Sequence, residues 1–453
     1  MFNLITDAAN PNRKRMKSSK HEDETKAVSD VNTIRPCLPD LVIHRILTLL
    51  PTKAAVRMSF LSKQWEGVWS LSPILDFDES GKIDDDDFDF DKLVQHTNFI
   101  SILQRYLEFR ERDKQTQILD RFRLCMTSYL YGDSSIVDKW LSFACEKSVK
   151  DVDLSLRITK LHTRLEFYYC LSRMSLFNAK SITTLKLEYV RIKVDLDSSA
   201  EPLLPCLKNM SLKSVHFDPE ALFCLIWECP SIEYLSLTTC SFEDSTFRVA
   251  SSNLKSLEIT LCDDAHFITV YEAVNLEYFI FSSELWVEHI TLYKSFNLKY
   301  ISIHAQDLRN LSLQGCHHSA KAKIHTPGLI RFDFNGFLIA ELSLEAPHLE
   351  TAIIKLWDLY DGESRFSALR DFLKAFDGPD DITLYICDFK VFIFSETFRE
   401  MFSSPMPRVK QLVMFLMSNP PTKAKDSSDL NDSLTWMAPY ASRLWLSGAI
   451  ATV

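Results

Sequence analysis

The amino-acid sequence predicts an α/β protein in which a small helical unit precedes a long, irregular solenoid of short parallel strands. Two patterns carry this prediction. Apolar residues at helical spacing lie between Pro39 and Pro51, and pairs of apolar residues separated by one residue recur over most of the later chain. Helical spacing is typical of an amphipathic helix, whereas a longer fixed period is typical of stacked repeats.

Residues 1–34 are polar and charged and show no apolar periodicity, so we expect a disordered arm. The arm contains a basic cluster formed by Arg13, Lys14, Arg15 and Lys17. Such a cluster is typical of a nuclear import signal, although similar runs occur in disordered tails without that role. The sequence therefore leaves nuclear import as one of two readings of this segment.

The helical unit spans residues 35–75 and begins with the helix between the two prolines. Pro39 suits the first helical position because it lacks the donor that is unpaired there, and Pro51 should end the helix. One apolar stripe at helical spacing is formed by Ile43, Ile46, Leu47 and Leu50. Val42 and Leu49 point in another direction, so part of the helix should face something outside the unit.

Two further short helices are predicted in the same unit. Thr52 can cap the first of them, and Ser62 can cap the second, in which Trp65 and Trp69 lie one turn apart. A unit of about 40 residues rarely buries enough apolar surface to be stable alone, and no cysteine cluster is present to help. We therefore expect this unit to associate with a partner.

The unit resembles an F-box. The residues that carry the resemblance are Leu38, Pro39, Asp40, Ile46, Leu47, Leu50, Pro51, Lys53, Leu61, Ser62, Lys63, Trp65 and Trp69. Gln64 and Phe60 depart from the residues common in the family. The following residues, 72–78, resemble the plant branch of the family, in which an F-box precedes leucine-rich repeats.

The resemblance implies that the unit docks on a Skp-family protein, which connects to a cullin, a RING protein and a ubiquitin-conjugating enzyme. The residues that we expect to dock collectively are Leu38, Pro39, Ile43, Ile46, Leu47, Leu50, Pro51, Val56, Leu61, Trp65 and Trp69. Some of them must belong to the core of the unit itself, and the sequence does not separate these from partner contacts.

Residues 76–91 are rich in aspartate and are predicted to form a solvated acidic linker. Alternate aspartates can also indicate a calcium loop. That reading fails because Phe90 stands where the loop needs glycine and His96 stands where it needs glutamate.

Residues 92–420 are predicted to form a leucine-rich-repeat solenoid, with residues 421–453 as a possible cap. The recurring apolar pairs are Leu185/Leu187, Met210/Leu212, Leu235/Leu237, Leu257/Ile259, Phe279/Phe281, Ile301/Ile303, Leu311/Leu313 and Phe332/Phe334. Between second members the steps are 25, 25, 22, 22, 22, 10 and 21 residues, mostly within the leucine-rich-repeat period. The step of 10 predicts short, irregular outer arcs.

Several pairs follow a repeated phrase that begins with Asn253, Asn275 or Asn297 and continues with leucine. We interpret this phrase as a stacking element, and the pairs as core. The predicted solenoid has short parallel strands on its concave face, with helices and loops outside. A target protein should bind the polar positions between the paired residues or the loops at the strand ends.

The sequence contains no recognisable catalytic constellation and only 9 glycines, with no phosphate-binding loop, so we expect neither an enzyme nor a cofactor. Cys316, His317, His318 and His325 lack the spacing of a known zinc site, and the 11 cysteines include no CxxC pair. We expect no metal. A net charge of −10 argues against nucleic-acid binding, and no apolar run is long enough for a signal or a membrane span. We therefore expect an intracellular protein, in the nucleus, the cytoplasm or both.

The preferred hypothesis is a substrate-recognition adaptor of an SCF-type ubiquitin ligase. One alternative is a leucine-rich-repeat scaffold that binds a protein partner independently of ubiquitin ligase, with the helical unit capping the solenoid. Another is a receptor in which a small molecule helps to seat the target, as in plant hormone receptors of similar architecture.

Overall fold

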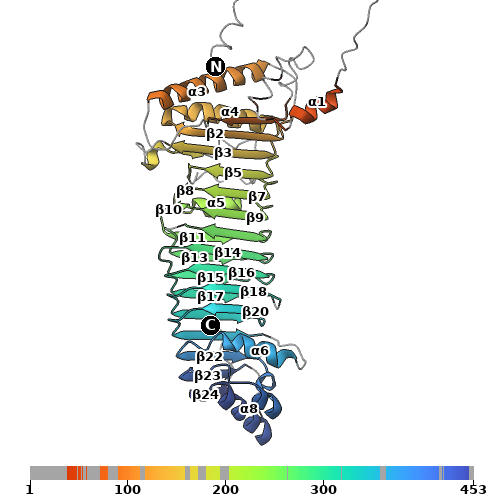
Figure 1. The fold of residues 1–453 in the computed structure, drawn as a ribbon, viewed down its shortest axis with the longest axis vertical. Helices are drawn as coiled ribbons and strands as arrows, with labels where there is room; N and C mark the ends of the chain where they lie inside the picture. Colours follow the sequence, from red (N-terminus) through yellow and green to blue (C-terminus); the bar gives the residue numbers. More distant parts are fainter. Residues whose placement is uncertain are drawn as a thin grey trace, which may run out of the picture.

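The protein is wound into one elongated stack of turns, with α1 (Asp40–Leu47) beside the first turns (Figure 1). The structure, a computed structural model, describes residues 38–47, 49–50, 52, 54, 58, 72–79, 90–112, 118–158, 164–171, 180–193, 204–262, 264–317, 319–357, 364–417, 421 and 423–447.

Parallel strands from successive turns form three sheets in this described part of the chain. The first has 11 strands in the order β1 (Ile74–Asp78), β2 (Arg121–Tyr129), β3 (Asp151–Ile158), β5 (Thr184–Glu188), β7 (Asn209–Lys213), β9 (Tyr234–Thr238), β12 (Ser256–Thr260), β14 (Tyr278–Ser283), β16 (Tyr300–Ala305), β18 (Lys321–His325) and β20 (Glu341–Glu345). The second has nine, in the order β11 (Thr246–Ala250), β13 (Phe267–Tyr271), β15 (His289–Tyr293), β17 (Asn310–Gln314), β19 (Arg331–Gly336), β21 (Thr351–Leu356), β22 (Asp381–Ile386), β23 (Gln411–Leu416) and β24 (Ser442–Ser447). A small third sheet contains β4 (Tyr169–Leu171), β6 (Val190–Ile192), β8 (His216–Phe217) and β10 (Ser241–Phe242).

Helices replace one of the sheets at both ends of the stack. Near the N-terminal end these are α3 (Phe90–Arg112) and α4 (Ser134–Glu146), and α5 (Ala221–Trp227) follows further along. Near the C-terminal end they are α6 (Ser364–Lys374), α7 (Glu396–Met401) and α8 (Ala424–Met437). The predicted α/β solenoid of parallel strands, preceded by a helix, is confirmed for the described residues.

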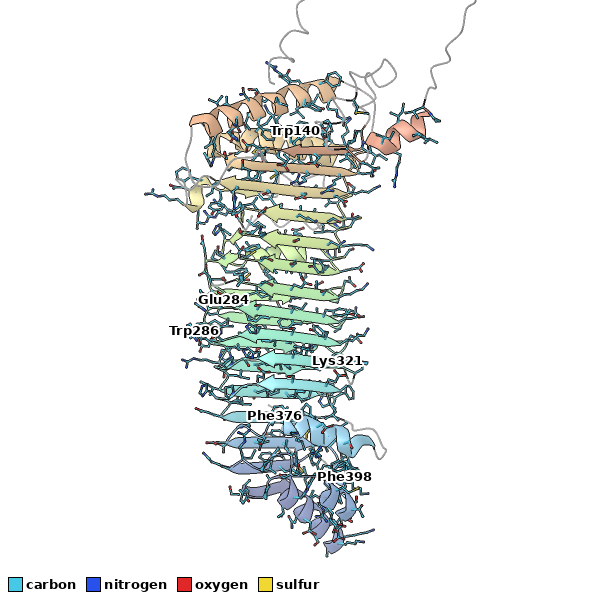
Figure 2. The ribbon with its side chains drawn as sticks, viewed as in Figure 1. Trp140, Glu284, Trp286, Lys321, Phe376 and Phe398 are labelled. Atoms are coloured by element: carbon cyan, nitrogen blue, oxygen red, sulfur yellow. The ribbon has the colours of Figure 1, made fainter. Side chains whose placement is uncertain are left out.

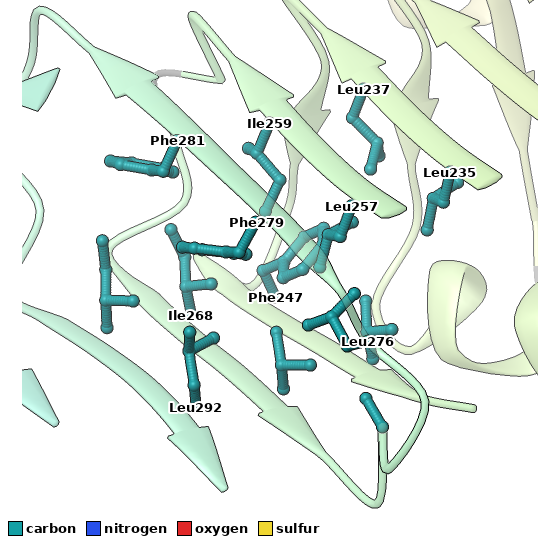
Figure 3. Packing of buried hydrophobic residues seen from close by; sticks show 14 of the residues in the cluster. Leu235, Leu237, Phe247, Leu257, Ile259, Ile268, Leu276, Phe279, Phe281 and Leu292 are labelled. Atoms are coloured by element: carbon teal, nitrogen blue, oxygen red, sulfur yellow. The ribbon is translucent and has the colours of Figure 1, made fainter. Parts of the chain in front are cut away.

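The core lies between the first and second sheets in the central turns. Leu257 and Ile259 of β12 are paired in register with Leu235 and Leu237 of β9 on one side, and every one of these side chains is buried. Figure 3 shows them facing Phe247 and other residues of the second sheet. Because strand residues alternate faces, each turn contributes its apolar pair to one continuous core.

The second sheet explains the step of 10 residues in the apolar pairs. Leu311 and Leu313 lie in β17, on the opposite sheet from Ile303 in β16. The first sheet continues instead through Ile324 of β18, which is 21 residues after Ile303. The outer arcs of the central turns are therefore strands of a second parallel sheet rather than irregular loops.

The repeated asparagine phrase has a direct structural role. The side-chain amide of Asn275 donates to the carbonyl of Ser252 at 2.7 Å, one turn earlier in the stack. Asn253 and Asn297 donate in the same way to Pro230 and Val274, each at 2.8 Å. These bonds link consecutive turns, because each side-chain amide reaches a backbone carbonyl of the preceding turn.

The corners after the strands of the first sheet use left-handed backbone without glycine. Ser214, Thr239 and Leu261 have φ between 49° and 53°, and each donates its backbone N–H to the next turn at 2.8–2.9 Å. Such a conformation is uncommon for residues other than glycine and is sustained here by the repeated hydrogen bonds. The scarcity of glycine therefore does not prevent tight corners.

Gly328 is a corner residue where a side chain has no room. A Cβ atom there would lie 2.6 Å from the carbonyl oxygen of Gln306 in the preceding turn, which already accepts the Gly328 N–H at 2.8 Å. We expect Gly328→Ala to destabilise the protein by about 1 to 3 kcal/mol, measured by thermal unfolding. Gly132→Ala is the control, since a Cβ atom there meets nothing within 4 Å; equal stability of the two variants would contradict the expectation.

Two predicted boundaries fall within paired elements of the solenoid. β1 crosses the boundary between residues 75 and 76, because Leu75 and Phe77 alternate into the core and the strand pairs with β2. At the other end, β24 pairs with β23, so the second sheet extends into residues 421–453. The solenoid therefore begins before residue 92 and continues after residue 420, the two limits predicted from the sequence.

Candidate functional site

Helix α1 begins where the proline motif predicts. The carbonyl of Pro39 accepts the N–H groups of Val42 at 2.8 Å and Ile43 at 3.2 Å, which forms the first helical turn. The helix ends at Leu47, and Leu49 follows in a turn whose N–H donates to Ile46 at 3.0 Å. The helix is thus shorter than the distance between the two prolines.

The two sides of α1 differ sharply in exposure. Ile43 is completely buried, and Ile46 and Leu50 are partly buried. On the other side, Leu41 is 85% exposed and Leu49 is 72% exposed. We define the α1 docking face as the exposed residues Leu38, Leu41, Val42, Arg45 and Leu49.

The predicted docking residues differ in their exposure. Ile43 belongs to the core and is not accessible to a partner, whereas Leu38 and Pro39 are exposed. Leu41 is absent from the predicted set, although its position one turn before Arg45 and two turns before Leu49 could have identified it. Leu47 is helical, but its side chain is not described. The other predicted docking residues lie outside the described part of the chain: Pro51, Val56, Leu61, Trp65 and Trp69. The basic residues Arg13, Lys14, Arg15 and Lys17 lie outside it as well.

One hydrogen bond attaches the helical unit to the first turn of the solenoid, and a second fixes the residue just before β1 to α3. The hydroxyl oxygen of Thr52, which is buried, accepts the backbone N–H of Asp76 in β1 at 2.6 Å. A guanidinium N–H of Arg110 in α3 donates to the carbonyl of Ser72 at 2.9 Å. Because β1 is the outermost strand of its sheet, Thr52 satisfies a group that would otherwise lie at an open edge.

An aromatic cluster supports this junction from inside. Phe77 of β1 packs against Trp140 of α4 with ring centroids 4.8 Å apart, and against Tyr106 of α3 at 5.4 Å. Trp140 is completely buried and also stacks on Phe122 at 5.8 Å. Figure 2 shows Trp140 at the end of the stack where α3 and α4 cover the first strands. The helical unit therefore joins a rigidly packed end of the solenoid.

A buried charge cluster joins the end of β1 to α3. His96, which is 2% exposed, contacts a carboxylate oxygen of Glu79 at 2.7 Å and one of Asp133 at 2.8 Å. Burial alone would lower the pKa of His96, but hydrogen bonds to Asp133 and Glu79 and their negative charges outweigh it and raise the pKa to about 9. His96 is therefore a positively charged bridge at neutral pH.

The outward face of the first sheet changes composition along the stack. In β9, β12, β14 and β16 every outward residue except Glu258, Ile280 and His304 is tyrosine, serine or threonine. We define the central Tyr/Ser surface as Tyr234, Ser236, Thr238, Ser256, Thr260, Tyr278, Ser282, Tyr300 and Ser302. The Tyr234 hydroxyl donates to Glu258 at 2.8 Å, which holds one ring in place.

Charged pairs flank the central Tyr/Ser surface. Towards the N-terminal end, Arg123 bridges Asp76 at 3.0 Å and Asp78 at 2.8 Å. Towards the C-terminal end, Lys321 contacts Glu341 at 2.6 Å. Figure 2 shows Lys321 at one edge of the stack, with Glu284 and Trp286 at the opposite edge. Two further ion pairs, Lys255 with Glu233 at 2.6 Å and Lys299 with Glu277 at 3.0 Å, lie just before the strands of this surface. A protein that covers the strand positions themselves therefore meets these pairs only at its rim.

The described residues include no group of three or more His, Cys, Asp or Glu side chains that could hold a metal ion. Cys316 is buried, which raises the pKa of its thiol to about 12, and His317 instead contacts the Ser319 hydroxyl at 2.7 Å. His325 contacts Glu345 at 2.6 Å, and His318 lies outside the described part. Among the helices that the structure describes, none has the length and apolar character needed to cross a bilayer.

Comparison with known proteins identifies two regions. A family model of the F-box domain matches residues 36–76, and one of the leucine-rich repeats of the FBD-associated F-box protein At5g56370 matches residues 137–327. A putative FBD-associated F-box protein of Arabidopsis thaliana, At5g56690, is 31% identical over 206 residues, which are 44% of this chain and 46% of that protein.

Two further Arabidopsis proteins that match this chain are also F-box proteins. The Arabidopsis F-box/LRR-repeat protein At3g58900 is 29% identical over 254 residues, 55% of this chain and 72% of that protein. The FBD-associated F-box protein At5g22730 is 29% identical over 225 residues, and this match covers 43% of its length. The chain spans just under half the length of the first relatives that it matches. The predicted resemblance is confirmed: models of the F-box domain and of the leucine-rich repeats of an FBD-associated F-box protein both match this chain, and its relatives include Arabidopsis F-box/LRR-repeat proteins.

Proposed function

We propose that this protein is a substrate-recognition adaptor of an SCF-type ubiquitin ligase. Its F-box would dock on a Skp-family protein, and through it on a cullin and a RING protein, while the solenoid would bind a target protein. The observation that carries this proposal is the α1 docking face, which lies within the matched F-box region and exposes leucine and valine around Arg45. The catalytic steps would belong to the partner machinery.

The energetics of the α1 docking face favour a protein partner. Leu41 and Leu49 are mostly exposed, and burying such a side chain fully is worth about 1.5 to 3 kcal/mol. Exposed apolar side chains that gather on one short helix are typical of helix-mediated recognition.

The target would bind the central Tyr/Ser surface. Tyrosine offers a large amphipathic contact area at low entropic cost, and serine offers adaptable hydrogen bonds, which is the chemistry of antibody binding loops. Tyr278 is 46% exposed near the middle of this surface. A rigid solenoid that holds both the target and the F-box would raise the effective concentration of the target near the ligase.

We expect a photo-reactive phenylalanine analogue at position 278 to cross-link to the target in a plant cell extract. The matched control is the same analogue at Tyr293, which is 42% exposed on the second sheet. Cross-linked species specific to position 278 would support the surface. Identical cross-linked species from positions 278 and 293 would show that the target does not bind specifically to the central Tyr/Ser surface.

The experiment that tests docking is a pull-down of a purified Skp-family protein with the full chain and with a variant lacking residues 35–70. The deletion stops before Ser72 because Ser72 and β1 belong to the first turn of the solenoid. Thermal unfolding of both proteins reports whether the solenoid remains folded. Binding by the intact chain alone would support the adaptor, and binding by the folded deletion variant would contradict it.

A second candidate function is a repeat scaffold that acts without ubiquitin ligase. The hydrogen bond from Asp76 to Thr52 favours it, because the helical unit then covers the open edge of the first sheet. Under this hypothesis the intact chain fails to bind a Skp-family protein, and the deletion variant unfolds at a lower temperature.

Nuclear entry remains a proposal that rests on the basic cluster of residues 13–17. Alanine at Arg13, Lys14, Arg15 and Lys17 would then shift a fluorescent fusion from the nucleus to the cytoplasm. An unchanged distribution would leave the cluster without that role.

A further inference from the structure

We propose that the turn between β14 and β15 binds a segment of a partner protein in which lysine or arginine stands next to an apolar residue. The site, which we call the Leu/Trp corner, consists of Glu284, Leu285 and Trp286 together with Asp264 of the preceding turn and Asp307 of the following turn. Figure 2 shows Glu284 and Trp286 at one edge of the stack, in the middle of the solenoid. The inference goes beyond the proposed function and does not depend on F-box docking.

The Leu/Trp corner exposes two neighbouring apolar side chains. Leu285 is 51% exposed and Trp286 is 43% exposed, whereas Val287, which follows them, is buried. The core therefore takes only one of three consecutive apolar residues. Phe267, which begins β13 in the preceding turn, is also exposed. Single exposed apolar residues are common, but a leucine and a tryptophan side by side on one turn indicate a surface that another molecule covers.

Hydrogen bonds hold the backbone of the corner in place. The buried hydroxyl of Ser283 accepts the N–H of Leu285 and donates to the carbonyl of the same residue, both at 3.2 Å. The Nδ1 atom of His266 contacts the carbonyl oxygen of Trp286 at 3.0 Å, and the two rings lie 5.0 Å apart. Because a carbonyl oxygen only accepts, His266 must carry a proton on Nδ1. A fixed turn thus presents the two side chains, which lowers the entropic cost of binding.

The aspartates of the corner lie on both sides of the tryptophan. Asp264, Trp286 and Asp307 each stand three residues before the first residue of β13, β15 and β17, and these strands pair in register. The next residue in each of the three turns is buried, so the turns follow the same path. Both aspartates and Glu284 are exposed, and none of the three has an ion pair among the described residues. Their charge is therefore available to a partner.

The excess of negative charge gives the chemistry of the partner. Among the described residues of turns 261–266, 284–288 and 306–309, acidic residues outnumber the one arginine, Arg309, by four to one. A tryptophan ring attracts a cation over its face, and carboxylates beside the ring bind the same cation. Leu285 adds an apolar contact next to this site. The corner therefore suits lysine or arginine beside an apolar residue, and it disfavours a second copy of itself, since like charges would meet.

The test is a selection of short random peptides, displayed on phage, for binding to the full chain. Peptides that bind the wild type but not the Leu285→Ser, Trp286→Ser double variant should be enriched in lysine or arginine next to apolar residues. In fluorescence anisotropy, such a peptide should bind the double variant at least about tenfold more weakly than the wild type, because the two side chains are the centre of the contact. Thermal unfolding checks that both proteins are folded.

A second variant changes the charge and leaves the apolar residues in place. Asp264→Lys together with Asp307→Lys should also weaken binding of the selected peptide at least about tenfold. Both aspartates are exposed, so the unfolding temperature should stay the same. Tyr293→Ser is the matched control: Tyr293 is 42% exposed, but Lys294 lies over its ring at 5.2 Å, so it should not hold a basic peptide. This control should bind the peptide like the wild type.

Weaker binding in both double variants, but not in Tyr293→Ser, would establish the site. A selection that yields no peptide specific to the wild type, or only peptides without basic residues, would overturn the inference. So would a dimer of the full chain that light scattering shows to be lost in the Leu285→Ser, Trp286→Ser variant, since the corner would then join two copies. Tighter peptide binding after removal of residues 1–34 would assign the corner to the chain's own basic cluster in place of a partner. Skp-family binding should be unchanged in every corner variant, so failure of this inference leaves the proposed function intact.

Discussion

Replacing Leu41 and Val42 together by aspartate should weaken binding of a Skp-family protein by at least about 100-fold, which corresponds to about 2.8 kcal/mol. Leu41 is 85% exposed and Val42 is 41% exposed, so the free protein should tolerate the charges. In the complex, the same charges would be buried against an apolar partner without compensation. Surface plasmon resonance with an immobilised Skp-family protein measures the change in dissociation constant.

An aspartate substitution at Ile43 distinguishes an effect on folding from an effect on docking. Ile43→Asp would place a charge in a completely buried position and should destabilise the helical unit itself. Ile46→Asp falls between these cases, because Ile46 is partly buried. Wild-type affinity in the folded Leu41→Asp, Val42→Asp double variant would exclude the α1 docking face as the contact.

Replacing His96 by alanine should lower the free energy of unfolding by about 3 kcal/mol at pH 6, because Glu79 and Asp133 would lose their buried cationic partner. The effect should depend on pH. Folding raises the pKa of His96 from 6.5 to about 9, so its stabilising contribution is complete below pH 6.5 and is lost as the pH rises through 9. Thermal unfolding at pH 6 and pH 9.5 tests both statements.

The matched control for His96 is His289→Ala. His289 is 46% exposed on the second sheet, so its removal should change stability by less than about 0.5 kcal/mol at either pH. If the two variants were equally stable at pH 6, or if the effect of His96→Ala grew towards pH 9.5, the charged bridge would be refuted.

The apolar pairs predict six strands of the first sheet, from β5 to β16, because the inward residues of these strands are large and alternate strictly. The second sheet escapes prediction for two reasons. Its pairs, such as Leu311/Leu313, are indistinguishable in sequence from those of the first sheet, and Ala322 in β18 is too small to mark the next strand of the first sheet. The left-handed corners at Thr239 and Leu261 carry no sequence signal, because hydrogen bonds between turns rather than glycine sustain them.

The candidate site was only partly predictable for a related reason. Spacing places Ile43 and Ile46 on one side of α1, but it does not say which side faces the protein's own core. The burial of Ile43 and the exposure of Leu41 answer that question for the described residues. The junction between Thr52 and Asp76 links positions 24 residues apart, and no local pattern indicates it.

The measurement that tests the central claim most directly is a calorimetric titration of the full, folded chain with a purified Skp-family protein. The adaptor account expects a complex of one copy of each protein with a dissociation constant below about 1 μM, in the range of specific protein interfaces. No heat of binding and no co-elution at tens of micromolar, with the chain shown to be folded, would contradict the account and make the independent scaffold the better description.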